Sequence, residues 1–425
     1  MATFAGITAN NQIKVISNEP INSKELSVIE IPADLQDKNL AELVLQCKIR
    51  NGKLVSKCKP GKPERVALVS NWKMRCGIAT YAEYLYQQLV PKLPDCKLFI
   101  EHNDNPTSPA HQLGSTTLNP NQVVECWKRG EPLTDLIAAI KDYDPDVILI
   151  NHEFGIFPIA RYWLSLLTQL SEYRIIATLH SVFPNHFDKT VVEASIPEIV
   201  VHLEGAKTAL INKGVSGKVH VIPHGCYTAD QTKLWNIYRS EHTFVQAGFL
   251  LPYKRFQDSI RAVSILKSKF PDVFFTGICS ETDFNAVAHQ TYYTELLGLI
   301  NELDLANNVA LIRGFQTDLA ISSYLRTNQV AVFPYGSDKE HTVYGASGAS
   351  RLAMAAGVPV ITSSVPHFED LPTIKADGPE AMAEALEKLF TDKTARKEQV
   401  EKQNAHIAAN SWAETADRYL EVLGA

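Results

Sequence analysis

Residues 329–363 read QVAVFPYGSDKEHTVYGASGASRLAMAAGVPVITS, and this stretch decides the fold class. A short apolar run (329–334) is followed by a polar loop, an apolar helical segment that begins near Ser347 and Gly348, and a second apolar run (358–363). A strand, a helix and a strand in this order are typical of a parallel βαβ unit. Small residues at the helix start leave backbone N–H groups free and make room for a phosphate. We therefore predict a parallel α/β unit with an anion site at Ser347 and Gly348.

The same alternation runs through the chain from Arg65 onward. Strand-like runs in the first half are VALVS (66–70), DVILI (146–150), RIIATL (174–179) and VHVIP (219–223), and in the second half TFVQAG (243–248), VFFTGI (273–278) and VALIRG (309–314). Apolar runs of this kind, with amphipathic helices between them, predict parallel sheets covered on both faces. We expect two Rossmann-like domains that face a cleft, at residues 63–235 and 236–405, with a hinge in the polar stretch 228–241.

Composition and charge exclude several classes of protein. The 425 residues are 45% hydrophobic and carry a net charge of −6, so the chain is neither disordered nor a polycation. The seven cysteines form no C-x-x-C pair, which argues against a zinc site and a disulfide framework and favours the cytoplasm. The start, MATFAGITANNQIK, does not resemble a secretory signal, and no apolar run approaches the roughly 18 residues of a membrane span.

Residues 1–62 do not follow the α/β rhythm and are expected to form a β-rich extension. Asn51-Gly52 stands between two alternating runs, which predicts a two-residue hairpin that pairs Arg50 with Lys53. One face of this hairpin would be apolar and the other basic, with the cations Lys48, Arg50, Lys53 and Lys57. Two interpretations stay open: a solvated face, or a docking site for a polyanionic acceptor.

Cations and glycines follow two of the predicted strands, at the sheet edge where α/β proteins bind ligands. Gly248 ends one strand, and Lys254 and Arg255 come just before the next helix. Paired cations at this place suit a phosphate, although an exposed pair is the plainer interpretation. Near the start of the chain, a loop with Lys73 and Arg75 leads to Gly77, which begins a helix. This segment suits an anion too, or is an ordinary βα turn.

Two histidines come directly after buried strands. His152, beside Glu153, follows DVILI and His180 follows RIIATL, so both could line one cleft or both could be structural. No third ligand stands at a metal-binding spacing, and no G-K-[ST] is present for a phosphoryl-transfer loop. A basic pair on one strand end and an open helix start on another suit a diphosphate leaving group without a metal. These features predict a nucleotide-sugar donor and no other cofactor.

The chain resembles the family-4 retaining glycosyltransferases, which have the GT-B fold. The resemblance spans residues 65–423 and rests on CGIATYAEYL, HEFGIF, TLHSVFP, VIPHG, GFLLPYKR, SGASRLAMAAGVPVITS and SWAETADRYLEVL. It implies retaining, metal-independent transfer from a nucleotide diphospho-sugar, and a last helix (406–425) that crosses back to the N-terminal domain. It also implies that His180 contacts the donor sugar, that Lys254 and Gly77 lie at the diphosphate, and that Ser347 and Gly348 receive its distal phosphate.

The chain departs from this family at its acidic positions. Two glutamates common in the family correspond to Tyr344 and Leu352, so Tyr344 is a candidate donor contact and Glu340 a candidate substitute for the first acid. Arg255 would replace a second phosphate-binding cation. On the acceptor side we expect Lys73, Arg75, His152 and Glu153. The acceptor could be a glycan, a lipid-linked sugar or, through the basic hairpin, hydroxymethylated DNA; a catalytically silent binding protein is the remaining alternative. The oligomeric state stays open.

Overall fold

The computed structural model describes residues 63–102, 122–228, 239–282, 286–336 and 342–424, and the backbone of five strands within the first 56 residues. Three of these strands, β1 (Thr3–Ile7), β2 (Ile13–Ser17) and β3 (Ser27–Ile31), form an antiparallel sheet in the order β2-β1-β3. The other two, β4 (Cys47–Arg50) and β5 (Lys53–Ser56), form a hairpin in which Arg50 pairs with Lys53. The predicted hairpin and its register are therefore confirmed; Lys57 lies outside the described residues.

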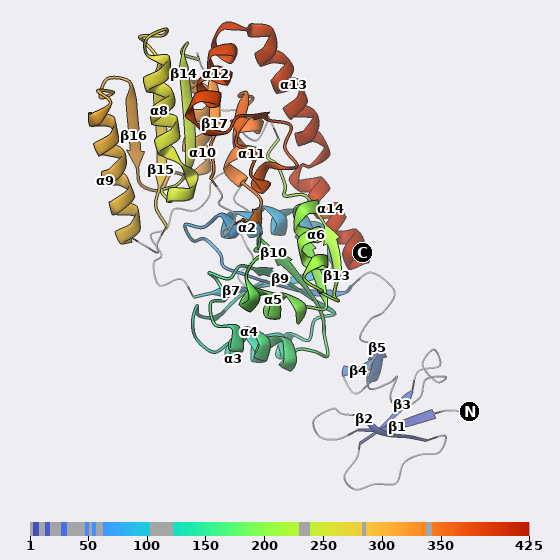
Figure 1. Ribbon diagram of the computed structural model, residues 1–425. Helices are drawn as coiled ribbons and strands as arrows, with labels where there is room; N and C mark the ends of the chain where they lie inside the picture. The colour runs from blue at the N-terminus through green and yellow to red at the C-terminus, as the bar shows by residue number, and fades with distance from the viewer. Residues whose placement is uncertain are drawn as a thin grey trace.

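The first large sheet has seven parallel strands and forms the lower lobe in Figure 1. Its order is β13-β12-β10-β9-β6-β7-β8. The strands are β6 (Arg65–Ser70), β7 (Asp95–Glu101), β8 (Val123–Trp127), β9 (Val147–His152), β10 (Arg174–Leu179), β12 (Glu198–Val201) and β13 (Lys218–Val221). Its helices are α2 (Gly77–Leu89), α3 (Thr134–Tyr143), α4 (Ala160–Gln169), α5 (Phe187–Ala194) and α6 (Glu204–Asn212).

The second sheet has six parallel strands and forms the upper lobe. Its order is β16-β15-β14-β17-β19-β20. The strands are β14 (Thr243–Phe249), β15 (Phe274–Ser280), β16 (Val309–Arg313), β17 (Val330–Phe333), β19 (Val360–Thr362) and β20 (Ile374–Lys375). Its helices are α8 (Phe256–Leu266), α9 (Ala286–Glu302), α10 (Asp318–Thr327), α11 (Gly348–Ala355) and α12 (Gly378–Thr391). In both lobes the buried β-branched strands and amphipathic helices confirm the predicted α/β class.

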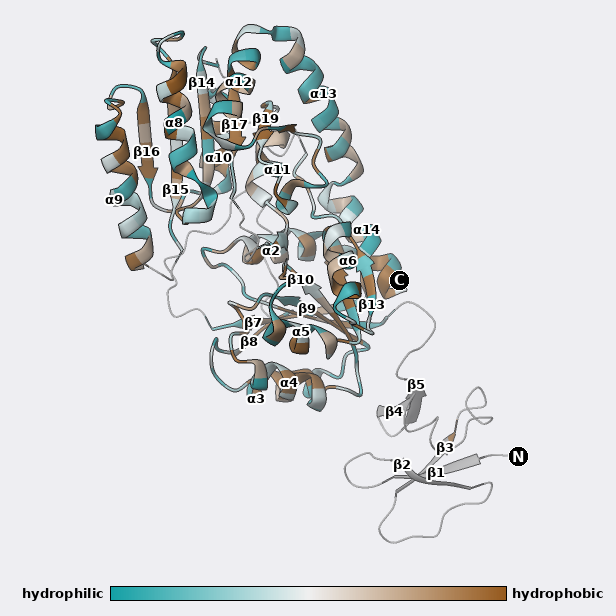
Figure 2. Ribbon diagram, in the orientation of Figure 1, coloured by the Kyte–Doolittle hydropathy of each residue, from teal (hydrophilic) through white to brown (hydrophobic). Residues whose placement is uncertain are grey.

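Hydropathy explains how each lobe is layered. Strand β9 is buried along its whole length, because helices cover both faces of its sheet. Helix α8 alternates between hydrophobic and hydrophilic residues in Figure 2, and it buries Phe256, Ile260 and Val263 against its sheet. Among the described residues, no helix is long and apolar enough to cross a membrane.

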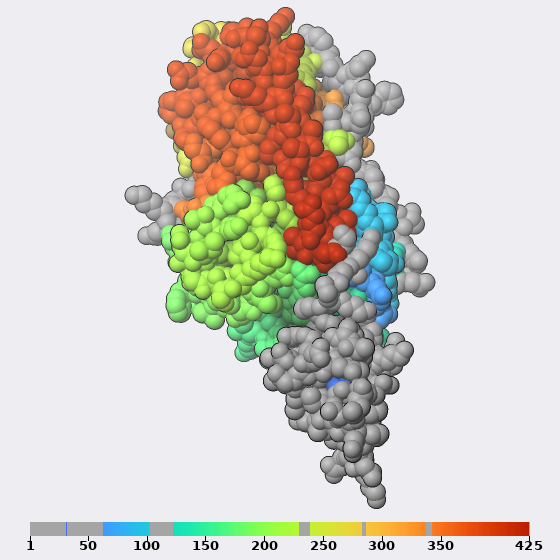
Figure 3. Space-filling model, turned by 90° about the vertical axis from the view of Figure 1, so that its right-hand side faces the viewer, coloured from blue at the N-terminus to red at the C-terminus, as the bar shows by residue number. Residues whose placement is uncertain are grey.

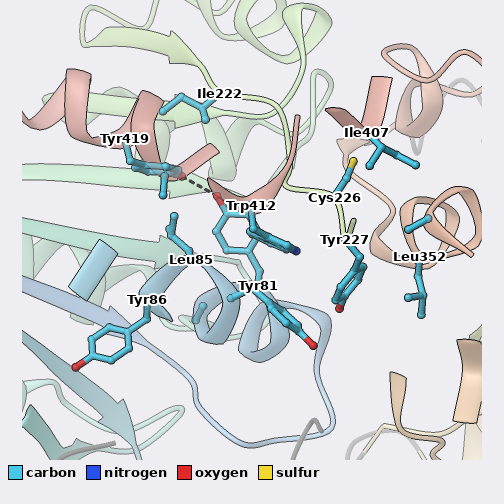
Figure 4. Close-up of a cluster of buried hydrophobic side chains, with 14 of the residues drawn as sticks. Tyr81, Leu85, Tyr86, Ile222, Cys226, Tyr227, Leu352, Ile407, Trp412 and Tyr419 are labelled. Carbon is cyan, nitrogen blue, oxygen red and sulfur yellow. Dashed lines mark hydrogen bonds between the residues drawn. The ribbon is translucent and has the colours of Figure 1, made fainter. Parts of the chain in front are cut away.

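Among the described residues, two segments make prominent contacts between the lobes. The first is the C-terminal segment: α13 (Lys393–Ala409) leads to α14 (Trp412–Leu423), which packs on α2 of the lower lobe. Figure 3 shows this segment, in red, running from the upper lobe down over the lower one. The second is a two-stranded antiparallel pair of β11 (Ser181–Val182) and β18 (Tyr344–Gly345). A single apolar core, part of which is drawn in Figure 4, runs through both lobes and α14.

Candidate functional site

A cavity between the lobes has a volume of about 270 Å³. The lower lobe contributes Gly77, Thr80 and Tyr81 to its wall, and α14 contributes Trp412. The upper lobe contributes the carboxyl ends of its strands and the loops that follow them, including Gly248, Lys254, Phe315, Asp318, Tyr335, Ser347, Gly348 and Leu352. The cavity therefore lies where α/β sheets bind ligands, at the strand ends that face the cleft.

Lys254 is the cation of this cavity. It ends the short 3-10 turn Pro252–Lys254 and is only 8% exposed. Its Nζ lies 3.7 Å from the ring centre of Tyr335 and 4.7 Å from that of Tyr253. No acidic side chain among the described residues pairs with it, and burial lowers its pKa to about 7. A buried ammonium that only aromatic rings surround is an incomplete anion site, because a buried charge is stable only when it is paired.

Two helix starts face the same cavity. Gly77 is the first residue of α2, no side chain caps that helix start, and there is open space around the Gly77 Cα. Ser347 caps α11, where its Oγ accepts a hydrogen bond from the Ser350 N–H, and Gly348 is the first helical residue. Free N–H groups and the helix dipoles make both starts attractive to an anion. Lys254, Gly77, Gly248, Ser347 and Gly348 thus come together as the sequence predicted.

Arg255 does not join them. Its backbone lies in the left-handed region, with φ of 54°, and its side chain turns toward α8. There Nε and Nη2 donate to the buried Asp258 carboxylate at 2.6 and 3.1 Å. The side chain also packs against Gly336, and it contributes nothing to the cavity wall. The predicted phosphate contact of Arg255 is corrected, since its charge is already paired within the upper lobe.

His152 is a second correction. It is 1% exposed and packs among Phe154, Phe157 and Trp163, with ring centres 4.5 to 5.7 Å away. Neither ring nitrogen has a hydrogen-bond partner, and burial lowers its pKa to about 3. The last residue of β9 points into the core between the sheet and its helices, so His152 has a structural position and not one on the acceptor side.

Glu153, the next residue, lies at the seam between the lobes. One of its carboxyl oxygens accepts a hydrogen bond from the Phe154 N–H at 2.9 Å. Burial raises its pKa, although the Ser181 side chain and Lys189 oppose this shift. Its charge also acts on Tyr253 of the upper lobe, whose pKa burial and Glu153 together raise to about 12. Glu153 stays a candidate for the acceptor side, and it does not belong to the cavity wall.

His180 lies one layer behind the cavity. Its ring packs edge-on against Tyr81, with centres 4.7 Å apart, and Tyr81 lines the cavity. Its Nδ1 is 3.4 Å from Nε2 of His202, and burial lowers the pKa of His180 well below its usual value. Its backbone oxygen meets Gly345 of β18 across the seam. The predicted contact of His180 with the donor sugar stays a prediction.

The remaining predicted residues lie elsewhere. The ring of Tyr344 presses against Gly205 of α6 and not into the cavity. Lys73 and Arg75 precede the cavity-lining Cys76, and the Arg75 guanidinium lies 5.8 Å from the ring centre of Phe315. Glu340 lies outside the described residues, as do the side chains of the hairpin cations. In the part of the chain that the structure describes, no three His, Cys, Asp or Glu side chains group as metal ligands do.

Several cavity residues escaped the sequence analysis. His224, in the VIPHG segment, is buried, and its Nδ1 donates to the Gly225 carbonyl at 2.8 Å, which leaves Nε2 as an acceptor near Gly348. Trp412 belongs to α14, and its ring stacks on Tyr84. Asp318 begins α10. The segments that carry His224 and Trp412 were visible as motifs, but a motif does not reveal which of its side chains faces a cavity made by both lobes.

Residues 241–392 match the model of the family described as glycosyl transferases group 1. The match lies within the upper lobe, which is similar to this family. Over 84% of its length the chain also has the fold of solved glycosyltransferases. Sucrose-phosphate synthase from Thermosynechococcus elongatus has 16% identity and a TM-score of 0.64, covering 84% of this chain and 98% of that one. Anabaena HepE, solved in complex with UDP, has 14% identity and a TM-score of 0.62, covering 84% and 99%.

A trehalose-6-phosphate synthase, solved in work on glycosyl transfer with retention, has 13% identity and a TM-score of 0.64, with coverage of 84% and 98%. At such identities these structures show the fold alone, and they confirm the GT-B architecture. No curated protein matches the chain in sequence. The family match and the fold together make the chain a glycosyltransferase.

Proposed function

We propose that this glycosyltransferase moves a sugar from a nucleotide diphospho-sugar to an acceptor hydroxyl with retention of the anomeric configuration and without a metal ion. The observation that carries the proposal is Lys254, a buried ammonium that has no acidic partner among the described residues, in a cavity that two helix starts also face. Retention and a UDP-type ligand are features of structural neighbours, which support the proposal for this chain by analogy.

The cavity supplies what a departing diphosphate needs. Negative charge builds up on the leaving group as the sugar–phosphate bond breaks, and fixed positive groups stabilise that charge most in a site that excludes water. Lys254 provides a full charge, and the N–H groups at the starts of α2 and α11 provide partial ones. Arg255 is not needed in this scheme, since Asp258 holds it.

The lower lobe supplies the acceptor side of the proposed reaction. Glu153 and Ser181 follow adjacent strands of that lobe and interact with each other. In the upper lobe, the Glu153 charge helps to raise the pKa of Tyr253, the residue before Lys254. An acceptor hydroxyl bound next to Glu153 would thus approach the donor from the lower lobe. We propose His180 as the sugar contact beside Tyr81.

The first experiment measures the thermal stability of the protein with UDP, GDP, ADP and CDP in the absence of metal. A nucleotide at about a hundred times its dissociation constant should add about 2.7 kcal/mol of stability. The matching nucleotide-sugar is then incubated with the protein, with and without EDTA, and release of the diphosphate is measured. Lys254→Ala should slow this release about a hundredfold, because a charged hydrogen bond is lost in the transition state.

The matched control is Lys218→Ala, which removes an exposed lysine of β13 that does not line the cavity. This variant should behave as wild type. Release that depends on added metal would contradict the metal-independent part of the proposal. A protein that responds to none of the four nucleotides would contradict the donor class itself.

A further inference from the structure

The cavity holds one carboxyl group. Among the described residues of its wall, Asp318 is the only acid, as Lys254 is the only lysine or arginine. A carboxylate repels phosphate, so the Asp318 side of the cavity suits a part of the ligand that donates hydrogen bonds. We therefore expect the anionic part of a ligand to lie at Lys254, and a part that bears hydroxyl or amide groups to lie at Asp318.

Asp318 is held in place from the lower lobe. It is the first residue of α10, after the cap Thr317, and its Oδ2 accepts a hydrogen bond of 2.7 Å from the Tyr227 hydroxyl. The Tyr84 hydroxyl of α2 is a second donor to Oδ2, at 3.5 Å. Both tyrosines are buried, and burial raises the pKa of each, so their hydroxyls keep the protons that they donate.

The second oxygen of this carboxylate is available to a ligand. Oδ1 of Asp318 has no hydrogen-bond partner within the described parts of the chain. The two tyrosines hold the carboxylate at the cavity wall through Oδ2 and leave Oδ1 for a ligand. A side chain that is oriented before binding loses little freedom when the ligand arrives, which favours a specific contact.

The neighbours of Asp318 indicate which part of a nucleotide it meets. Phe315 and Gln316, from the same loop, line the wall beside it and offer a flat ring and an amide, which suit the face and the edge of a base. Asp318 offers acceptors only, which match vicinal hydroxyl groups. Leu352, at the family position of an acid, also lines the wall and has no polar atom.

We infer that Asp318 binds the ribose hydroxyls of the donor nucleotide, a contact for which Leu352 has no polar atom. The inference rests on the proposed function, because it assigns the nucleoside part of the same donor. It places the ribose between a base at Phe315 and a diphosphate at Lys254, the order in which these groups are joined in a nucleoside diphosphate.

The test is a calorimetric titration with UDP, GDP, ADP and CDP, each compared with its 2′-deoxy and 2′,3′-dideoxy counterparts. The wild type should bind the tightest ribonucleotide about 10- to 100-fold more tightly than its dideoxy form, since hydrogen bonds to a charged group are lost. Asp318→Asn keeps an oxygen that accepts from Tyr227 but removes the charge. It should reduce this ratio to about threefold or less while the dideoxy form binds as it does to wild type.

The matched control is Asp135→Asn, which changes another first-turn aspartate, on α3 of the lower lobe. It should leave the ribose preference unchanged. A wild type that binds ribose and dideoxyribose nucleotides equally would overturn the inference without any variant, and so would an Asp318→Asn protein that loses its preference among bases but keeps the one for ribose. Failure of all four nucleotides to bind would instead overturn the proposed function.

Discussion

Lys254 shows how burial and chemistry are linked at a single residue. The side chain is packed against two tyrosine rings, and burial lowers its pKa to about 7, so the free protein holds its ammonium at the edge of deprotonation near neutral pH. A diphosphate would pair with this charge and raise the pKa again. Binding of the donor and protonation of Lys254 are therefore coupled.

This coupling predicts a pH-dependent affinity for nucleoside diphosphate. Above pH 7 the free protein must take up a proton to bind, so the dissociation constant should rise about tenfold per pH unit until the pKa of the complex is reached. The nearby His367, with its pKa lowered to about 3, and Tyr253, with its pKa near 12, do not titrate in this range. Calorimetry between pH 7 and 9 measures the slope, and Lys254→Met should bind weakly with no slope. An equal slope in both proteins would contradict this assignment.

His152 predicts how the folded state responds to acid. Its folded pKa of about 3 lies below the ordinary value near 6.5, so only the unfolded chain takes up its proton as the pH falls below about 6.5. The stability present above pH 6.5 should thus be lost toward pH 3, by up to about 1.4 kcal/mol per pH unit. Urea unfolding of wild type and His152→Phe from pH 7.5 to 5 measures this, and the variant should show the shallower loss. Identical slopes would exclude His152 as a cause.

The sequence predicted that both Lys254 and Arg255 contact a phosphate, but only Lys254 lines the cavity. Both follow one strand end, and residue type alone suits both for a phosphate. The backbone of Arg255 is left-handed, and its side chain pairs with Asp258, three residues later in the chain. The amino-acid sequence does not reveal such a backbone angle. His152 and His180 likewise both follow buried strands, but one side chain enters the core and the other the seam between the lobes.

At the scale of elements, the pair β11–β18 joins the loops that carry the site. Ser181 and Val182 follow His180, and Tyr344 and Gly345 precede the helix start at Ser347. A Cβ on Gly345 would lie 3.0 Å from the backbone oxygen of His180, so the strands can approach this closely because position 345 is a glycine. The pair therefore sets the distance between the two lobes at the cavity.

Gly345→Val should force the lobes apart at this seam. Because both lobes line the cavity, the affinity for nucleoside diphosphate should fall about tenfold or more, at a cost of about 1–3 kcal/mol in packing. Calorimetry measures the affinity, and small-angle scattering measures any increase in the radius of gyration. Gly298→Val is the matched control, since no atom lies within 4 Å of a Cβ at that exposed site on α9. Wild-type affinity in Gly345→Val would show that the pair has no influence on the cavity.

At the scale of the molecule, α14 binds the C-terminal end of the chain to the lower lobe. Tyr419 contacts Tyr81 and Thr178 through its hydroxyl at 2.9 and 2.7 Å, and Figure 4 shows Tyr419 and Trp412 beside Tyr81. Arg174 donates to the backbone oxygens of Val422 and Leu423 at the end of the helix. The resemblance implied a last helix that crosses back, but it did not reveal that Trp412 lines the cavity.

Gly225→Ala tests this packing. A Cβ there would lie 2.3 Å from the Trp412 ring, which is buried and has no room to turn. The substitution should cost about 1–3 kcal/mol of unfolding free energy by overpacking and should weaken nucleotide binding as well, because Trp412 belongs to the cavity wall. Urea unfolding and calorimetry measure the two effects. A variant as stable as wild type would contradict the packing described for α14.

The α/β class, the two lobes and the hairpin register follow from local patterns, so they could be predicted from the sequence. The cavity could not, because residues far apart in the chain complete its wall: Asp318 accepts from Tyr84 and Tyr227, which belong to other elements. Whether the hairpin cations Lys48, Arg50, Lys53 and Lys57 bind modified DNA stays a prediction, which titration with duplex DNA at low salt tests.

The most direct test of the central claim is calorimetry of the tightest nucleoside diphosphate with three proteins: wild type, Lys254→Ala and Arg255→Asn. Asparagine is chosen at position 255 because it tolerates the left-handed backbone there. We expect Lys254→Ala to weaken binding about 30-fold or more and Arg255→Asn to weaken it by about threefold at most. The reverse order, or equal affinity in all three proteins, would contradict a diphosphate site built on Lys254.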